Sequence, residues 1–142
     1  MNDQSSLLGM HSARPRGEAA RLLGHRLLSV EEAPLPRVEA EFTATGDFCN
    51  PLGVIQGGIL MAMLDQALID ACTVATRLER AAMTLEMQCN FLRPAFPGRL
   101  TCSATVLQAG RTTAFAEARL SDPEGRLLAT ASAVAALQEK TG

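Results

Sequence analysis

The sequence predicts an α+β protein in which one long apolar helix packs against an antiparallel sheet. Three observations favour this fold class. Within residues 50–71, a glycine-marked loop is followed by a nearly uncharged stretch with the pattern of a helix. Two segments with the alternation of strands precede this stretch. Four more such segments follow it. A helix that is apolar on nearly every face needs cover on every side. One sheet can wrap much of such a helix, and a second copy of the protein could cover the remainder.

Composition places the chain among globular proteins and excludes several classes. Its 142 residues suffice for one domain with a real core, and 47% are apolar while 20% are charged. A net charge of -2 without long basic runs gives no reason to expect a nucleic-acid partner. The longest uncharged stretch, residues 48–64, contains Asn, Pro, Gln and three Gly, so we expect no membrane span. No signal-like apolar segment is present near Met1, and we expect a cytoplasmic protein.

The N-terminal residues differ in character from the rest. Residues 1–17 are polar and include Pro15 and Gly17, which predicts a flexible, frayed lead-in. Residues 18–142 show no linker and no internal repeat, and we expect them to form a single domain.

Three short elements are predicted before the long helix. Residues 18–23 have a helical pattern that Gly24 stops, and residues 26–32 form a short strand. From Arg37 the sequence alternates cleanly, as a half-buried strand does. The apolar side chains of that strand point one way: Val38, Ala40, Phe42 and Ala44.

The long helix is predicted over residues 58–76. It lacks a polar N-cap of the usual kind, so Gly57 and its neighbours leave backbone N–H groups free at the helix start. One carboxylate, Asp65, lies in the middle of the helix. Burying an ionised carboxylate is costly unless it is paired, which makes a functional role for Asp65 more probable than for an acid at random.

The remainder of the chain is predicted to be strands. Four alternating segments are separated by turns that contain Pro or Gly, over residues 83–91, 100–110, 112–121 and 127–137. Residues 122–125, Asp-Pro-Glu-Gly, have the composition of a hairpin turn. The last strands are rich in Ala, which suggests a surface packed closely by other backbone, such as that of a partner subunit.

Cysteine and histidine give no sign of a metal site or a cofactor. The four cysteines include no C-x-x-C pair, and the two histidines, His11 and His25, are far apart in the sequence. Reduced cysteines acting as small core residues explain this pattern. Cys49 lies in the loop before the helix, but no nearby histidine could activate it as a nucleophile.

The central motif resembles that of a known family. The pattern N-x-x-G-x-x-Q-G-G over residues 50–58, then Asp65 after six residues, and later F-L-R-P and G-R, resembles the hotdog-fold acyl-CoA thioesterases. It is most similar to the branch with phenylacetic-acid-pathway and 4-hydroxybenzoyl-CoA (Arthrobacter-type) thioesterases, over residues 22–137. The resemblance implies a long central helix wrapped by a curled antiparallel sheet. It also implies dimers that usually associate into tetramers, with active sites at the dimer interface.

The resemblance also implies roles for individual residues. Asp65 matches the catalytic acid, which acts as nucleophile or as general base for water, and Gly57 matches the residue whose backbone N–H polarises the thioester carbonyl. Asn50 matches the loop amide that contacts the substrate or the attacking water. Further positions are expected to bind the acyl-CoA substrate: Gln56, Gly58, Arg93, Arg111 and Thr112.

One departure from the family and two rival interpretations remain. The family commonly has His-Gly-Gly where this chain has Gln56, which can hydrogen bond but cannot titrate near neutrality. The rivals to an acyl-CoA thioesterase are a non-catalytic acyl-CoA-binding protein and a hotdog enoyl-CoA hydratase or dehydratase.

The long helix contains a second acid, Asp70. Asp70 lies about 140° around the helix from Asp65, and we interpret it as a structural or interface residue.

Overall fold

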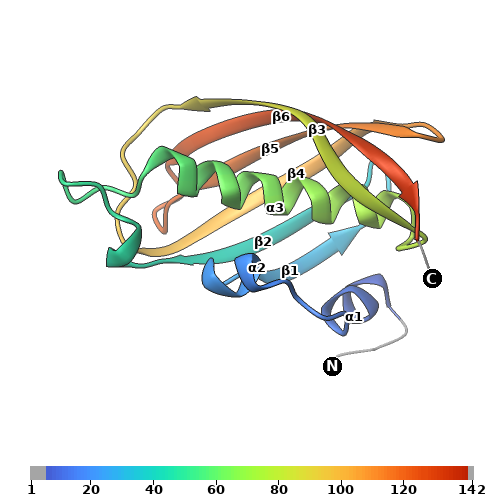
Figure 1. Ribbon diagram of the computed structural model, residues 1–142, viewed down its shortest axis with the longest axis horizontal. Coiled ribbons are helices and arrows are strands. Elements are labelled where there is room, and N and C mark those ends of the chain that lie inside the picture. The colour runs from blue at the N-terminus through green and yellow to red at the C-terminus, as the bar shows by residue number, and fades with distance from the viewer. Residues whose placement is uncertain (1–5, 141–142) are drawn as a thin grey trace.

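The computed structural model describes residues 6–140 and shows six antiparallel strands curled around one long helix (Figure 1). The helices are α1 (Leu7–Ser12), α2 (Glu18–Leu22) and α3 (Gly57–Ala75), with a 3₁₀ turn at Gly46–Phe48. The strands are β1 (Arg26–Glu31), β2 (Arg37–Ala44), β3 (Arg80–Phe91), β4 (Gly98–Ala109), β5 (Thr113–Ser121) and β6 (Leu127–Glu139). The order across the sheet is β1-β2-β4-β5-β6-β3. The predicted fold class is confirmed.

The core lies between α3 and the concave face of the sheet. Alternate residues of β2, β4, β5 and β6 point toward the helix, as the period of a strand requires. The inner face of β5 and β6 is mostly alanine: Ala114, Ala116, Ala118, Ala129, Ala131, Ala133 and Ala135 are buried. These two strands contact α3 of the same chain. The small side chains therefore let α3 pack closely against the sheet. The partner subunit that we expected at this surface is not needed to explain the alanines.

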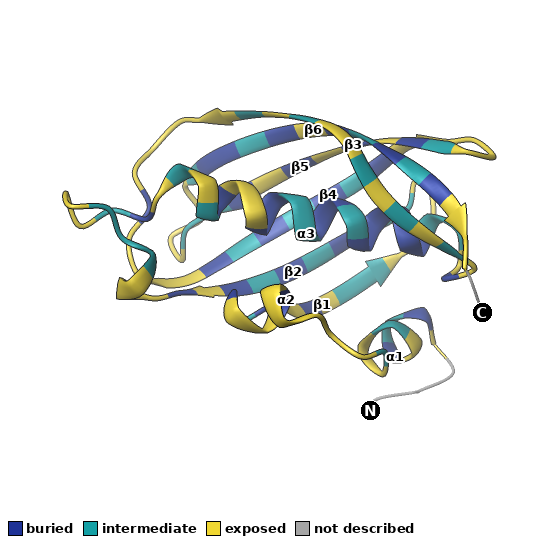
Figure 2. Cartoon of the chain, in the orientation of Figure 1, coloured by how far each residue is buried: buried dark blue, intermediate teal, exposed yellow. Residues whose placement is uncertain are grey.

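Helix α3 is not covered on every side. Figure 2 shows that its C-terminal half is mostly buried, whereas exposed residues recur in its first turns. By length and composition α3 could cross a membrane, but more than half of it is buried inside this sheet, as in the core helix of a soluble fold. The helix starts one residue earlier than predicted, at Gly57.

Strand β3 forms one edge of the sheet and pairs only with β6 among the described residues. Apolar side chains are exposed at two places on it: Met83 is 57% and Leu85 61% exposed, and Phe91 and Leu92 at the strand end have more than half of their surface exposed. Between these two places the exposed residues are polar: Glu86, Gln88 and Asn90. An edge strand with a free row of backbone N–H and C=O groups and some exposed apolar side chains is a ready site for pairing with another chain.

The prediction of a frayed lead-in is wrong for part of residues 1–17. Leu7–Ser12 forms helix α1, whose first turn is capped because the Ser6 hydroxyl accepts a hydrogen bond of 3.0 Å from the Gly9 N–H. Leu7 is buried, and α1 contacts β1. Apolar residues at the start of this short segment attach it to the rest of the protein. Because the segment is polar on average, its composition did not indicate this packing. Residues 1–5 lie outside the described part of the chain.

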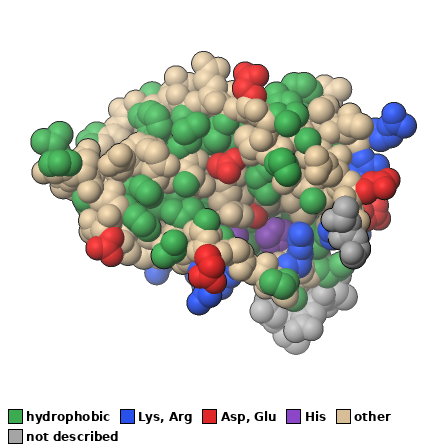
Figure 3. Space-filling model, in the orientation of Figure 1, with side chains coloured by type: hydrophobic (Ala, Val, Ile, Leu, Met, Phe, Trp, Pro, Cys, Tyr) green, Lys and Arg blue, Asp and Glu red, His purple; other side chains and the backbone are tan. Residues whose placement is uncertain are grey.

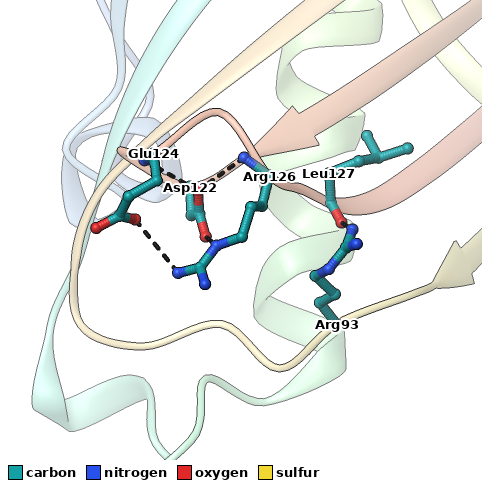
Figure 4. Close-up of polar contacts among 5 residues, drawn as sticks. All are labelled: Arg93, Asp122, Glu124, Arg126 and Leu127. Atoms are coloured by element: carbon teal, nitrogen blue, oxygen red, sulfur yellow. Dashed lines mark hydrogen bonds and ion pairs between the residues drawn. The ribbon is translucent and has the colours of Figure 1, made fainter.

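The predicted hairpin turn joins β5 to β6 (Figure 4). The Asp122 carboxylate accepts hydrogen bonds from the backbone N–H groups of Glu124 and Arg126, at 3.0 and 2.9 Å. The Arg126 side chain donates to the same carboxylate at 2.7 Å. Gly125 has φ +80°, a left-handed conformation that glycine adopts without strain. Side-chain bonds to the turn backbone thus fix where β6 begins, next to Arg93.

Candidate active site

The loop before α3 is held in shape by Asn50. Its side-chain oxygen accepts hydrogen bonds from the backbone N–H groups of Leu52 at 2.9 Å and Val54 at 3.3 Å. Its backbone adds two further bonds across the turn, to Val54 and Gly53. The side-chain NH₂ group has no acceptor in the described part of the chain, and the residue is half-buried. Asn50 therefore shapes the loop with its oxygen and keeps two N–H donors available to a ligand.

The start of α3 exposes unpaired backbone donors, as predicted. Gln56 is the N-cap residue, and its side chain makes no capping hydrogen bond. Its carbonyl instead accepts from the N–H groups of Ile59 and Leu60, at 2.9 and 3.3 Å. The N–H groups of Gly57 and Gly58 find no acceptor among residues 6–140. A free N–H at the positive end of a helix dipole suits a developing oxyanion.

A cavity of about 330 Å³ lies beside this helix start. Its lining residues come from the loop, from α3 and from the segment after β3: Ile55, Gly57, Leu60, Phe91, Leu92, Arg93, Pro94 and Ala95. The Phe91 ring faces Gly57 so closely that a Cβ added to Gly57 would lie 3.6 Å from it. Arg93 donates a 2.9 Å hydrogen bond to the Leu127 carbonyl (Figure 4). The F-L-R-P segment and the G-G segment, which are far apart in sequence, thus line one cavity.

Asp65 has a partner that the sequence did not reveal. The Thr84 hydroxyl of β3 donates a 2.5 Å hydrogen bond to Oδ1 of Asp65, and both residues are half-buried. The pairing of β3 with β6 shifts register between Thr84 and Glu86. Such irregularities re-aim side chains and are frequent next to active sites. The other oxygen of Asp65 has no partner in the described part of the chain, so one oxygen is held in place while the other is available.

The carboxylate of Asp65 influences a neighbouring thiol. Burial raises the pKa of Cys89 in β3, and the negative charge of Asp65 raises it further. Cys89 therefore stays a neutral thiol near neutral pH. Cys49 bonds the Gly53 carbonyl at 3.5 Å, and no histidine contacts it in the described part of the chain. Neither cysteine has the setting of an activated nucleophile.

The remaining predicted substrate-binding residues lie at the other end of the sheet. Arg111 and Thr112 form the turn between β4 and β5, and both are exposed. The Arg111 carbonyl accepts a hydrogen bond from Arg80, the first residue of β3. Gly57 lies instead beside Phe91, at the last residue of β3. One chain thus places Arg111 and Thr112 a whole strand length away from Gly57.

The predicted catalytic pair is also separated within one chain. Gly57 and Asp65 lie eight positions apart on one continuous helix, and at 1.5 Å rise per residue that spacing is about 12 Å along the axis. A carbonyl bound at the Gly57 N–H would therefore be out of reach of Asp65 of the same chain. The structure gives three separate groups: Gly57 with Arg93, Asp65 with Thr84, and Arg111 with Thr112.

Comparison with known proteins identifies the family. The model of the thioesterase superfamily matches residues 52–129 of the chain, which is more than half of it. The chain belongs to the thioesterase superfamily. A candidate esterase of Saccharolobus solfataricus is 30% identical over 112 residues, 78% of this chain and 76% of that protein.

Solved structures agree with this assignment. A phenylacetic acid degradation-related protein of Ralstonia eutropha, itself a candidate thioesterase, superposes with a TM-score of 0.82 at 34% identity, covering 89% of this chain and 95% of that one. A thioesterase family protein of Silicibacter pomeroyi gives a TM-score of 0.80 at 27% identity, over 99% and 100% of the two chains. The fold is the hotdog fold, and the protein is a thioester hydrolase.

This thioesterase also contains a buried polar cluster that the sequence did not predict. His11 and His25, which are far apart in the sequence, both bond the Asp70 carboxylate, at 3.2 and 2.7 Å. Gln66 donates to it at 3.1 Å. Asp70 is structural, as interpreted, and its three donors are the reason that an acid is tolerated there. His25 pairs with Asp70 rather than with Asp65, so the acid–histidine pair of a hydratase is not formed at Asp65.

The same contacts set the ionisation of Asp70. Burial acts to raise the pKa of this carboxyl, but hydrogen bonds from His11 and His25, together with their charges, outweigh burial and hold the pKa below its ordinary value of 3.8. Asp70 is therefore ionised at neutral pH. No group of three or more His, Cys, Asp or Glu residues within the described range 6–140 could hold a metal ion.

Proposed function

We propose that this thioesterase hydrolyses an acyl-coenzyme A, with an aryl or a short- to medium-chain acyl group, to the free acid and coenzyme A. The observation that carries the proposal is that α3 holds two parts of an active site, one at Gly57 and one at Asp65. Free N–H groups at Gly57 open onto a cavity, and a carboxylate at Asp65 has one oxygen fixed by Thr84. An oxyanion donor and a positioned carboxylate are the two parts that thioester hydrolysis needs.

The residues have distinct tasks in the proposed reaction. The Gly57 N–H donates to the thioester oxygen as negative charge develops on it. Asp65 either takes a proton from the attacking water or attacks the carbonyl itself to give a mixed anhydride that water then cleaves. In both routes the C–S bond breaks, a C–O bond forms, and coenzyme A leaves as the thiol. Asn50 offers its NH₂ group to the substrate or the water.

We propose further that two copies of the chain pair through β3, so that Asp65 of one copy serves Gly57 of the other. The separation of about 12 Å within one chain supports this arrangement, because a single copy cannot bring both groups to one carbonyl. The free edge of β3, with its exposed Met83 and Leu85, offers the surface. Antiparallel pairing of two β3 strands sets the Arg80 end of one against the Phe91 end of the other. Arg111 and Thr112 would then approach the partner's cavity, where they could hold phosphates of coenzyme A.

A free-thiol assay over aryl and aliphatic acyl-CoAs tests the proposed reaction. Turnover by the purified protein and its loss in Asp65→Asn are expected. No turnover on any substrate, with binding retained, would favour a non-catalytic acyl-CoA-binding protein. Unchanged turnover in Asp65→Asn would remove the assigned role of Asp65.

Mixed dimers test the shared site separately. A Gly57→Pro copy and an Asp65→Asn copy are each expected to be inactive alone. After unfolding and refolding in equal amounts, half of the dimers are mixed and each has one intact site, so about a quarter of wild-type activity should return. A mixture that stays inactive, although size-exclusion chromatography shows dimers, would mean that each site lies within one chain.

A further inference from the structure

A second cavity, of about 310 Å³, lies beside α3 and is lined by none of the candidate site residues. Its walls are α1, the segment that leads into α2, the start of β1, and the face of α3 that carries Gln66 and Asp70. It shares no lining residue with the cavity beside Gly57. Its volume suits a small molecule. Figure 3 shows histidine beside Lys or Arg side chains on the surface of the molecule in this region.

The charged lining of this cavity is predominantly cationic. Arg14, Arg16 and Arg26 line it together with the two histidines, and Asp70 is the one carboxylate among its lining residues. Asp70 already accepts from three donors, since His11 and Gln66 bond Oδ1 and His25 bonds Oδ2. The carboxylate therefore holds the histidines in the wall, and none of the three arginines pairs with it among residues 6–140.

The three arginines differ in what they already bind. Arg16 donates to the His25 carbonyl, and Arg26 pairs with the Glu41 carboxylate at 3.4 Å. The half-buried Arg14 side chain has no hydrogen-bond or ion-pair partner among residues 6–140. A guanidinium in this state presents a fork of donors that matches the two oxygens of a carboxylate or a phosphate. The uncharged part of the wall, with Leu27 and Ile69, gives room for a small apolar body.

We propose that this cavity is a binding site for a small ligand that bears an oxyanion, a carboxylate or a phosphate group, which Arg14 binds through its guanidinium. The site is distinct from the cavity beside Gly57 and takes part in no bond-breaking step. The His11–Asp70–His25 cluster is part of its wall and ties α1, the residue before β1, and α3 together around it. The proposal does not rest on the proposed hydrolysis, because it concerns binding alone.

Titration followed by ¹⁵N–¹H NMR of the full chain tests the proposal, with inorganic phosphate in one arm and hexanoate in the other, at constant ionic strength. Saturable shifts are expected at the amides of Arg14, Arg16 and Gly17 and of residues 69–73 in at least one arm, and the arm that responds names the source of the oxyanion. In Arg14→Gln the dissociation constant should rise on the order of tenfold or more. Arg21→Gln is the matched control, because Arg21 is exposed on α2, pairs with Glu18 and lies outside the cavity.

Three results would overturn the proposal. The first is the absence of saturable shifts in both arms. The second is a response at the amides around Gly57 instead of those around Arg14. The third is equal weakening of binding in Arg14→Gln and Arg21→Gln, which indicates a general ionic effect. Thermal melting of both variants keeps the comparison to folded protein, and since no turnover is measured, none of these results depends on thioester hydrolysis.

Discussion

Replacing Gly57 by proline removes one N–H group and little else. Gly57 is the first residue of α3, the position at which proline is most readily accepted in a helix, since the N–H there has no intrahelical partner. The preceding residue, Gln56, already has the extended backbone that precedes proline, with φ -60° and ψ 137°. An added Cβ would meet the Phe91 ring at 3.6 Å, an ordinary van der Waals contact. The helix should therefore form in the variant.

The expected loss follows from the role of the donor. Removal of one oxyanion-hole donor costs about 100- to 1000-fold in kcat, or about 3–4 kcal/mol of transition-state stabilisation. Gly57→Ala is the matched control, since it adds the same Cβ and keeps the N–H. Steady-state thiol release from an acyl-CoA should show the loss in Gly57→Pro and at most a small change in Gly57→Ala. Circular dichroism should show similar melting for both.

Two outcomes would refute this reasoning. If folded Gly57→Pro keeps the wild-type kcat, the Gly57 N–H does not polarise the carbonyl. If Gly57→Ala loses as much activity as Gly57→Pro, the determinant is the space beside Phe91 and not the donor.

Three other perturbations give separate expectations. Thr84→Val should lower kcat about tenfold or more, because the Asp65 carboxylate loses the hydrogen bond that orients it. Thr84→Ser keeps the hydroxyl and should retain the wild-type kcat. Equal kcat in all three proteins would contradict an orienting role for Thr84. The depressed pKa of Asp70 stabilises the folded state: the full contribution is present above pH 3.8, and it is lost as the pH falls through the lower pKa of the folded protein. Urea unfolding should therefore show a decrease in the free energy of unfolding at acid pH in the wild type, and this decrease should be absent in Asp70→Asn. Burial raises the pKa of Cys72 to about 11 and also raises that of Cys102, so a thiol reagent at pH 8 should label neither until the protein unfolds.

Local patterns were sufficient to predict most of the fold. Period-two alternation located the strands, and the apolar, nearly uncharged stretch after Gly57 located the helix to within one residue at each end. These signals depend only on neighbours in the sequence. The error at α1 has the opposite cause, since its six residues are stabilised by the burial of Leu7 against distant elements, which polar composition does not reveal.

The sequence could propose candidate site residues only where they lie close together in the chain. The loop and helix residues, from Asn50 to Asp65, lie on one continuous segment whose spacing is visible in the sequence. Thr84 contacts Asp65 only because β3 packs against α3 at that point, where the pairing of β3 with β6 also shifts register. The convergence of His11 and His25 on Asp70 likewise depends on where α1 and β1 dock. No periodicity within a strand or helix encodes such contacts.

The uncovered side of α3 connects the stability of the protein to its proposed chemistry. A helix start without a side-chain cap is a local cost to stability, and the same missing cap leaves the Gly57 N–H free for a substrate. A free β3 edge with exposed Met83 and Leu85 is likewise a liability in a single chain, and pairing across it would bring a second Asp65 to that N–H. Residues that weaken the isolated chain are thus the ones that the proposed dimer uses. Substitutions that cap α3 or place charge on the β3 edge should therefore stabilise the monomer while lowering activity, which is the trade-off expected of a functional site.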